Sequence, residues 1–138
     1  MRITCQKALL GLLEVSGKRN LIKFVNKIGI ITFYKKQMSK LRERFKKEFG
    51  HKIMESIDIN TVDGFQGQEK DIIILSCVRT SMTNGIGFLG DERRMNVALT
   101  RARFNLIILG KVDALCRNDS WNSLIRDAER RQLVSIVS

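Results

Sequence analysis

The sequence predicts an α/β fold with a mostly parallel sheet and helices on both of its faces. Short apolar runs rich in β-branched residues carry this prediction, because continuous rather than alternating burial is typical of parallel strands covered on both sides. Helical patterns separate the runs, in the order helix, strand, helix, strand, strand, helix, strand, helix. The clearest runs are Ile28–Thr32, Ile72–Leu75 and Phe104–Gly110.

Length and composition indicate a single domain. The chain has 138 residues, and 43% of them are apolar, which is enough to bury a core. No internal repeat or low-complexity tract divides it. We therefore expect residues 1–138 to form one domain.

The first part of the chain is expected to form two helices around one strand. A helical stripe of apolar residues predicts a helix over Cys5–Val15. The strand Ile28–Thr32 precedes a second helix, Tyr34–Phe49, which has an apolar face and a lysine-rich face. Gly50 is expected to stop this helix, because glycine readily adopts the left-handed conformation that follows a helix end.

The centre of the chain, Asn60–Ser76, is a glycine-punctuated turn between two apolar runs. The strand-like run Ile57–Val62 leads into it, and Gly64 and Gly67 allow positive φ and close backbone approach. Ligands of open α/β sheets bind outside the strand ends, where loops of this kind gather. A polar surface turn without a ligand is the alternative. The candidate ligand-binding side chains are Gln66, Gln68, Glu69 and Lys70.

The last part of the chain is expected to contain two helices, each capped by a polar residue. Asp91 can cap a helix over Glu92–Arg103 by accepting hydrogen bonds from its first free N–H groups. Ser120 can cap a final helix that places Trp121 in the core. Leu133–Ser138 is expected to be a last strand or a frayed tail.

The segment Arg93–Arg103 combines four arginines with a short apolar stripe. On the predicted helix, Arg94 and Arg101 are seven residues apart and share one flank of that stripe. Such an arginine at the edge of a cleft can stabilise the charge on a transferring phosphoryl group. A salt-bridged surface helix is the alternative. The stripe consists of Met95, Ala98, Leu99 and Ala102.

The charge is strongly positive and unevenly distributed. The net charge is +11, with an isoelectric point near 10.1. Residues 1–57 carry 14 Lys and Arg against 4 Asp and Glu, a net charge of +10, whereas residues 58–138 carry +1. This pattern indicates a polyanionic partner, nucleic acid before membrane, unless the lysines only form a solvated face.

Cysteine and histidine usage predicts no metal site. The three cysteines are widely spaced, and His51 is the only histidine, so neither a zinc site nor a disulfide framework is expected. A reducing, intracellular compartment fits this usage. No apolar run reaches membrane-spanning length, and we expect no membrane association.

Three blocks of the chain resemble motifs IV, V and VI of superfamily 1 helicases. Ile28–Gln37 resembles motif IV, Thr61–Asp71 resembles motif V, and Arg93–Arg103 resembles motif VI. Their order and spacing are similar to the Upf1-like branch, and Gly87-Phe88-Leu89 before the third block is most similar to the senataxin-like group within it. The resemblance covers about residues 5–130.

The resemblance implies the C-terminal of two RecA-like motor domains, which bind ATP between them. By position, Glu69 would contact the nucleotide at its ribose. Arg101 would be the catalytic arginine finger that reaches the γ-phosphate. Gly67 and Gln66 would shape the loop that couples the nucleotide to strand movement, and Arg94 is a weaker candidate on the nucleotide side. The implied cofactor is ATP with Mg²⁺, whose protein ligands are expected in the first domain.

The resemblance also implies a partner, single-stranded RNA or DNA, along which the motor would move in the 5′ to 3′ direction. Thr32, Phe33, Tyr34 and Thr61 would lie along this strand, partly through backbone. Phe33 stands where the family usually has proline, which changes the turn beside the track. A nuclear rather than cytoplasmic location is expected.

The 138 residues contain no phosphate loop, because Gly17-Lys18 lacks the preceding glycine and the following Ser or Thr of that motif. ATP hydrolysis is therefore expected to need the first RecA-like domain in cis. The domain over residues 1–138 is expected to be either whole or incomplete at its N-terminus.

Two alternatives remain at this point. One is a non-catalytic, basic nucleic-acid-binding module derived from a helicase, and the other is a protein-interaction remnant.

Overall fold

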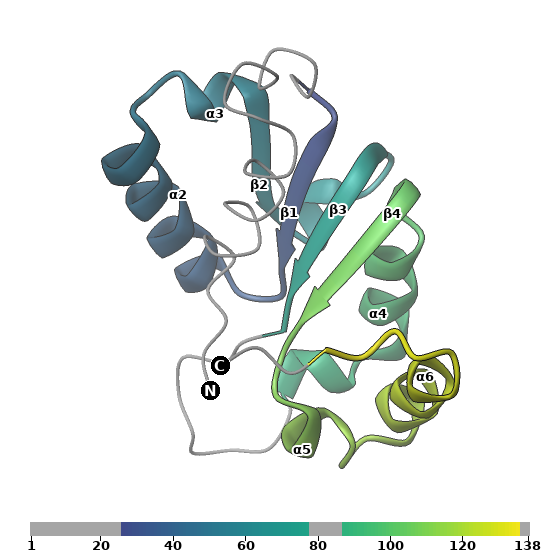
Figure 1. Cartoon of the computed structure of the whole chain (residues 1–138). Helices are drawn as coiled ribbons and strands as arrows, with labels where there is room; N and C mark the ends of the chain where they lie inside the picture. Colours follow the sequence, from purple (N-terminus) through teal and green to yellow (C-terminus); the bar gives the residue numbers. More distant parts are fainter. Residues whose placement is uncertain (1–25, 78–86, 136–138) are drawn as a thin grey trace.

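The computed structural model describes residues 26–77 and 87–135, and their fold is the predicted α/β fold of RecA-like type. Four strands form an all-parallel sheet in the order β2-β1-β3-β4 (Figure 1). The helix predicted over Cys5–Val15 lies outside the described residues. The strands are β1 Ile28–Thr32, β2 Ile57–Thr61, β3 Lys70–Ser76 and β4 Ala102–Leu109.

Helices cover both faces of the sheet, as the sequence predicts. The helix α2 lies against one face, beside β1 and β2, and α4 lies on the opposite face (Figure 1). The α-helices are α2 Lys35–Phe49, α3 Ile53–Ser56, α4 Glu92–Leu99, α5 Val112–Leu115 and α6 Asp119–Arg130; the 3₁₀ helices are η2 Asp63–Phe65 and η3 Gly87–Gly90.

Alternating strand residues build a separate core on each face of the sheet, because successive side chains of a strand point to opposite sides. On the α2 side, Ile30 and Ile74 pack with Phe45. On the α4 side, Ile31 and Leu75 belong to a larger cluster with aromatic and sulfur-containing side chains. That cluster includes Phe65, Met95 and Trp121.

The central crossover is held in place by one aromatic side chain. The chain leaves β2, passes across β1 as η2, and enters β3 on the far side. Phe65, in η2, is fully buried, and a Cβ added at Gly29 of β1 would meet its Cζ at 2.8 Å. Glycine at position 29 therefore makes the space that Phe65 fills.

Gly50 and Asp91 mark helix ends as predicted, whereas the predicted C-terminal end of the arginine helix is wrong. Gly50 ends α2 with φ 82°, and its N–H donates to Lys46 O. Asp91 caps α4 by accepting from the N–H groups of Arg93 and Arg94. However, α4 ends at Leu99 rather than at Arg103.

The early end of α4 has a local cause. The Thr100 hydroxyl donates to the carbonyls of Asn96 and Val97, and its N–H bonds to the same two groups, which tightens the last turn. Beyond it, Lys70 N–H donates to Arg101 O, so the chain is already pairing with β3. Arg101 and Arg103 consequently do not share a helix flank with Arg94.

The cap of the last helix is also different from the prediction. Asn118, not Ser120, caps α6, by accepting from Trp121 N–H over 3.1 Å. The Ser120 hydroxyl instead donates to Glu92 on α4 over 2.7 Å. Residues Leu133–Ser135 form no regular element, and the remainder of the predicted last strand lies outside the described residues.

Candidate functional site

The glycine loop and the arginine helix run side by side along one face of the molecule. Asp63, at the start of the loop, pairs with Arg94 in the first turn of α4. Near the end of the loop, the carbonyl of Gln68 accepts from Arg101, just past the end of α4. The segments that resemble motifs V and VI therefore form one continuous surface rather than two separate ones.

Arg101 is half-buried and has no carboxylate partner among the described residues. Its Nη1 donates to Gln68 O over 3.4 Å, and its Nη2 lies 3.2 Å from the Thr100 hydroxyl. Its Nε is buried without a hydrogen-bond partner in the same part of the chain. Within the described residues, the charge of this guanidinium is therefore not neutralised by a carboxylate.

Glu69 lies at the same edge of the sheet as Arg101. Residues Lys70 and Ala102 pair at the start of β3 and β4, so the residues just before them, Glu69 and Arg101, end up beside one another. Glu69 itself is exposed and pairs with Arg103 over 3.4 Å. Gly67, also exposed, has φ 75°, the left-handed conformation that the sequence predicts for this glycine.

Arg94 differs from Arg101 because two carboxylates surround it. Its Nε and Nη2 donate to the two carboxylate oxygens of Asp63 over 3.3 and 3.2 Å, and its Nη1 lies 3.2 Å from Asp91. The hydrogen bond to Asp63 raises the pKa of Arg94 above its ordinary value, with a contribution from Asp91. Arg94 therefore joins the glycine loop to the N-terminus of α4.

A shallow pocket of about 440 Å³ lies between the loop and α4. Its lining contains both acids that hold Arg94, together with the amide of Gln66 and the side chain of Val97. The pocket brings Gln66 and Arg94 to one place, whereas Arg101 and Glu69 lie farther along the same surface. The complete lining is Val62, Asp63, Gln66, Asp91, Arg93, Arg94 and Val97.

The predicted nucleic-acid residues gather at the opposite edge, where β1 and β2 end. Thr32 and Thr61 are register partners on neighbouring strands, and Val62 N–H donates to Thr32 O over 2.9 Å. The Thr61 hydroxyl accepts from Gly64 N–H and so holds the first turn of η2. The side chain of Thr32 is fully buried, and its hydroxyl donates to Tyr34 O.

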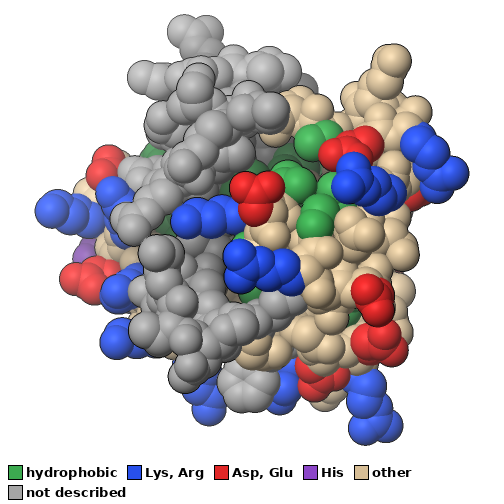
Figure 2. Space-filling view, turned by 90° about the horizontal axis from the view of Figure 1, so that it is seen from below, with side chains coloured by type: hydrophobic (Ala, Val, Ile, Leu, Met, Phe, Trp, Pro, Cys, Tyr) green, Lys and Arg blue, Asp and Glu red, His purple; other side chains and the backbone are tan. Residues whose placement is uncertain are grey.

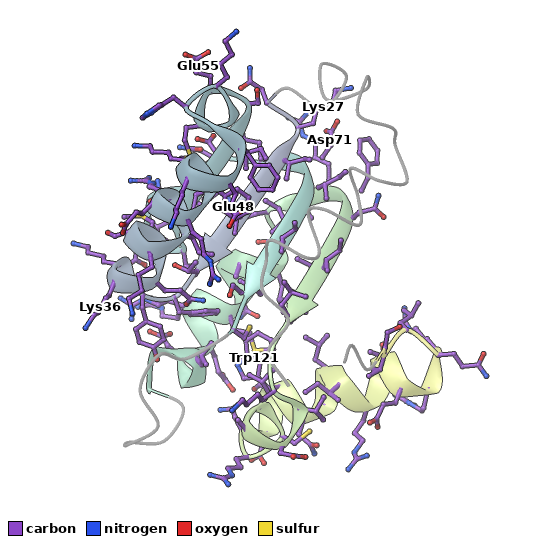
Figure 3. The ribbon with its side chains drawn as sticks, turned by 60° about the vertical axis from the view of Figure 1, so that its left-hand side comes forward. Lys27, Lys36, Glu48, Glu55, Asp71 and Trp121 are labelled. Atoms are coloured by element: carbon purple, nitrogen blue, oxygen red, sulfur yellow. The ribbon has the colours of Figure 1, made fainter. Side chains whose placement is uncertain are left out.

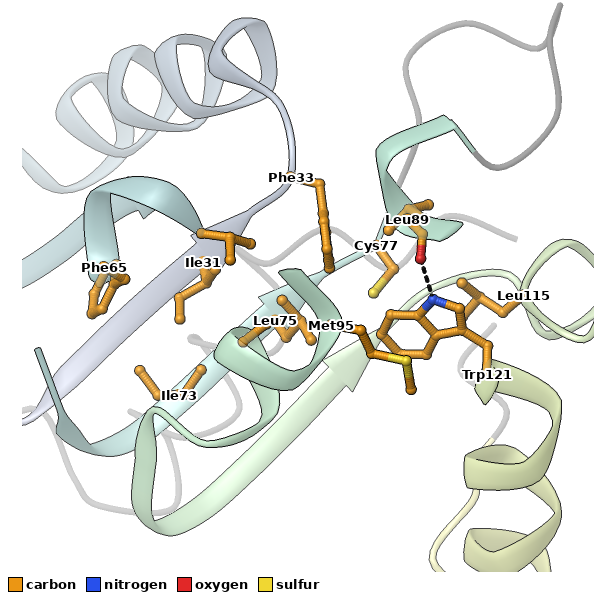
Figure 4. Close-up of a cluster of buried hydrophobic side chains, with 12 residues drawn as sticks. Ile31, Phe33, Phe65, Ile73, Leu75, Cys77, Leu89, Met95, Leu115 and Trp121 are labelled. Atoms are coloured by element: carbon orange, nitrogen blue, oxygen red, sulfur yellow. Dashed lines mark hydrogen bonds between the residues drawn. The ribbon is translucent and has the colours of Figure 1, made fainter. Parts of the chain in front are cut away.

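The structure places Phe33 in the core instead of on a surface that a nucleic acid can reach. Phe33 is 6% exposed, and its ring meets Trp121 edge to face, with ring centroids 6.3 Å apart (Figure 4). Trp121 in turn donates from Nε1 to Leu89 O over 2.6 Å. Of the four predicted track residues, Tyr34 and Thr61 are half-buried, whereas Thr32 and Phe33 can offer only their backbone.

Sequence reasoning did not identify Asp63 or Arg103 as parts of this site. Asp63 lies 31 residues from its partner Arg94, and no periodic pattern links two positions so far apart. Arg103 was placed on a helix, but it is on β4 and reaches Glu69 and Asp71 there. The sequence pattern does not show that the helix gives way to a strand after Leu99, and Arg103 is misplaced for that reason.

Within residues 26–77 and 87–135, no helix is long and apolar enough to cross a bilayer. In the same ranges, no group of three or more His, Cys, Asp or Glu residues is arranged to hold a metal ion.

The parallel sheet, with its glycine loop and arginine helix, defines the chain as a RecA-like α/β domain. A family model described as an AAA domain matches residues 4–113. The chain belongs to this family, and within it to the Upf1-like superfamily 1 helicases, with senataxin and Sen1 among its relatives.

The relatives are named helicases and are much longer than this chain. Helicase sen1 of Schizosaccharomyces pombe is 54% identical over 121 residues, which are 88% of this chain and 7% of the relative. Probable helicase senataxin of Homo sapiens is 45% identical over 118 residues, 85% of this chain and 4% of the relative. Regulator of nonsense transcripts 1 of Dictyostelium discoideum is 43% identical over 132 residues, 94% and 10% respectively.

Proposed function

We propose that the chain is the C-terminal motor domain of an ATP-dependent helicase that moves 5′ to 3′ on single-stranded RNA or DNA in the nucleus. The names of its relatives support a helicase role. Because the chain spans only 4–10% of the three relatives described, the rest of the motor, including a first RecA-like domain, would be supplied by other residues of the same polypeptide.

One observation carries the nucleotide part of the proposal: Arg101 and Glu69 lie at the same edge of the sheet. Arg101 combines a positive charge with a buried, unpartnered Nε, and none of its hydrogen bonds in the described residues is to a carboxylate. A guanidinium of this kind suits a phosphate oxygen in a dry cleft. We therefore propose Arg101 as the arginine finger and Arg94 as the second candidate.

The other nucleotide contacts follow from the same surface. Glu69 would accept a hydrogen bond from the nucleotide ribose, and the left-handed turn at Gly67 would let backbone approach it. Bound ATP with Mg²⁺ supplies the phosphoryl group whose transfer to water drives the motor. The ligands of Mg²⁺ are proposed to come from the first domain.

The single strand is proposed to cross the edge where β1 and β2 end. Thr61 and Tyr34 are the side chains that are partly accessible there, and Thr32 and Phe33 would contribute main-chain groups. Main-chain contacts to phosphates hold a strand without reading its bases, which suits a motor that moves along any sequence.

An ATPase comparison tests this proposal. We expect a longer protein that contains residues 1–138 and a first RecA-like domain to hydrolyse ATP, and to do so faster when single-stranded RNA or DNA is present. The 138-residue chain alone is expected to show no hydrolysis above background, since it lacks a phosphate loop. Robust hydrolysis by the 138-residue chain, or none by the longer protein, would contradict the proposal.

A non-catalytic nucleic-acid-binding module is the second candidate, and the net charge of +10 in residues 1–57 favours it. This candidate predicts salt-dependent binding to single strands that neither ATP nor the substitution Arg101→Ala changes in the longer protein. The motor proposal predicts that ATP alters that binding.

A further inference from the structure

The outward face of α2 is a row of exposed cations on the side of the domain away from the sheet. With 100° per residue, Lys36, Lys40 and Lys47 lie opposite the buried stripe that contains Phe45. All three lysines are exposed, and Figure 3 shows Lys36 pointing away from the sheet. We call these three lysines the α2 ridge.

No lysine of the α2 ridge forms a salt bridge within residues 26–77 and 87–135. None of the Lys and Arg residues of α2 has a carboxylate within salt-bridge distance in the described part of the chain. The helix α6 shows the opposite arrangement, because Arg126 and Arg130 pair with Glu129 and Asp127 on the same helix, and Arg131 also pairs with Asp127. Exposure to solvent alone therefore does not explain why the basic side chains of α2 form no salt bridges in the described residues.

The cations in the first half of α2 work against the stability of that part of the helix. Lys36 and Lys40 are four residues apart, as are Lys40 and Arg44, and like charges at this spacing repel one another. The first turn of α2 contains Lys35 and Lys36 and no acidic residue, which also opposes the helix dipole. A bound polyanion would remove both penalties.

One basic residue of α2 is used differently, which delimits the surface. Arg42 donates from Nε and Nη2 to Ile59 O over 2.9 and 2.6 Å, and so joins α2 to β2. It is a packing residue and is excluded from the ridge. Figure 2 shows further Lys and Arg side chains along the side of the molecule on which α2 lies.

The shape and composition of the ridge favour double-stranded over single-stranded nucleic acid. Surfaces that bind single strands combine cations with aromatic side chains on which bases stack. The aromatic residues of α2, Phe45 and Phe49, face the core instead. The outward face of α2 carries the three lysines and Glu43 but no aromatic side chain, so it can reach phosphates but cannot stack bases. A duplex presents its phosphates outward.

We propose that the α2 ridge binds the phosphate backbone of a nucleic-acid duplex. The N-terminus of α2 closely follows the end of β1, so the ridge begins beside the edge proposed for the single strand and runs back along the outside of the domain towards α3 (Figure 1). This site goes beyond the proposed motor function, because it needs neither ATP nor Arg101.

The test measures binding of the 138-residue chain to a blunt DNA duplex by fluorescence anisotropy, without ATP, over a series of salt concentrations. The variant Lys36→Gln/Lys40→Gln/Lys47→Gln removes the ridge. The variant Arg126→Gln/Arg130→Gln/Arg131→Gln removes the same charge from exposed positions that pair with carboxylates. Circular dichroism of both variants checks that they fold.

We expect the ridge variant to bind duplex at least about tenfold more weakly and to lower the salt slope by about 2–3, near 0.9 for each lost phosphate contact. The α6 variant is expected to keep most of the affinity and the slope. Equal losses in both variants would mean net charge alone. The proposal would also be overturned if the ridge variant lost affinity only for single-stranded probes, or only for an acidic peptide, and kept its affinity for duplex.

A charge reversal within the same surface gives a second measurement. Glu43 lies on the outward face between Lys40 and Lys47 and has no salt bridge in the described residues. Glu43→Gln is expected to strengthen duplex binding a few-fold, because it removes the one repulsive charge beside the phosphates. Unchanged or weaker binding would contradict the location of the site.

Discussion

The guanidinium of Arg101 donates to the main-chain carbonyl of Gln68 over 3.4 Å, one residue before Glu69. This contact joins the C-terminal end of the arginine segment to the glycine loop. It places the charge of Arg101 and the carboxylate of Glu69 at one edge of the sheet, although 32 residues separate them in sequence. Both proposed nucleotide contacts depend on this relationship.

Glu69→Gln should weaken nucleotide binding without weakening the fold. Its ion pair with Arg103 is solvent-exposed, and such pairs contribute about 0–1 kcal/mol to the free energy of unfolding. We expect the longer protein with this substitution to bind ATP several-fold more weakly in a calorimetric titration, at nearly unchanged urea stability.

Asp71→Asn is the matched control for Glu69→Gln. Asp71 also faces Arg103, at 3.8 Å, but it has no proposed nucleotide contact. ATP affinity is expected to stay at the parent value in this variant. Equal weakening by both substitutions would assign the effect to Arg103 rather than to Glu69.

Gly29→Ala should destabilise the domain by packing strain. The added Cβ would meet Phe65 Cζ at 2.8 Å and Ile73 Cδ1 at 2.9 Å, both in the closely packed centre of the sheet. Overpacking of this kind costs about 1–3 kcal/mol of unfolding free energy. Urea unfolding of the 138-residue chain measures it.

Gly90→Ala is the control for that substitution. A Cβ at position 90 would meet only Asn118 Nδ2, at 3.8 Å, which is an ordinary contact, so stability should change little. If Gly29→Ala were as stable as Gly90→Ala, Phe65 would not be seated against β1 as described.

Phe33→Ala should act on stability rather than on a base-stacking contact. The ring is buried against Trp121, and loss of a buried phenylalanine costs about 3–5 kcal/mol of unfolding free energy. Because that loss can unfold the chain, Phe33→Leu is the practical variant. We expect it to be less destabilised than Phe33→Ala. Below the melting temperature of the variant protein, its affinity for single strands should be unchanged. Specific loss of strand affinity in folded Phe33→Leu protein would show instead that the ring contacts nucleic acid.

The sequence was sufficient to predict the strands and the coverage of both faces of the sheet. Ile28–Ile31 and Ile72–Leu75 are apolar without interruption, and local composition determines that pattern. Gly50 and Asp91 were also predictable, because helix ends are set by residues within one turn.

The errors all involve a tertiary contact or a competing local bond. The apolar stripe continues from Met95 to Ala102, so periodicity could not show that pairing with β3 replaces the helix after Leu99. Asn118 caps α6 by accepting from Trp121 N–H, whereas the Ser120 hydroxyl is engaged by Glu92 of α4, a contact between distant parts of the chain. The burial of Phe33 depends on Trp121, which is 88 residues away in sequence.

Single-turnover and steady-state ATPase assays of Arg101→Ala, in a protein that contains both motor domains, test the central claim most directly. We predict that kcat falls by roughly 10³-fold or more, as for other arginine fingers, while the Kd for ATP changes only a few-fold. Arg94→Ala, which removes a guanidinium already paired with Asp63 and Asp91, should reduce kcat much less. Parent-like turnover in Arg101→Ala, or loss of turnover in Arg94→Ala alone, would contradict the account.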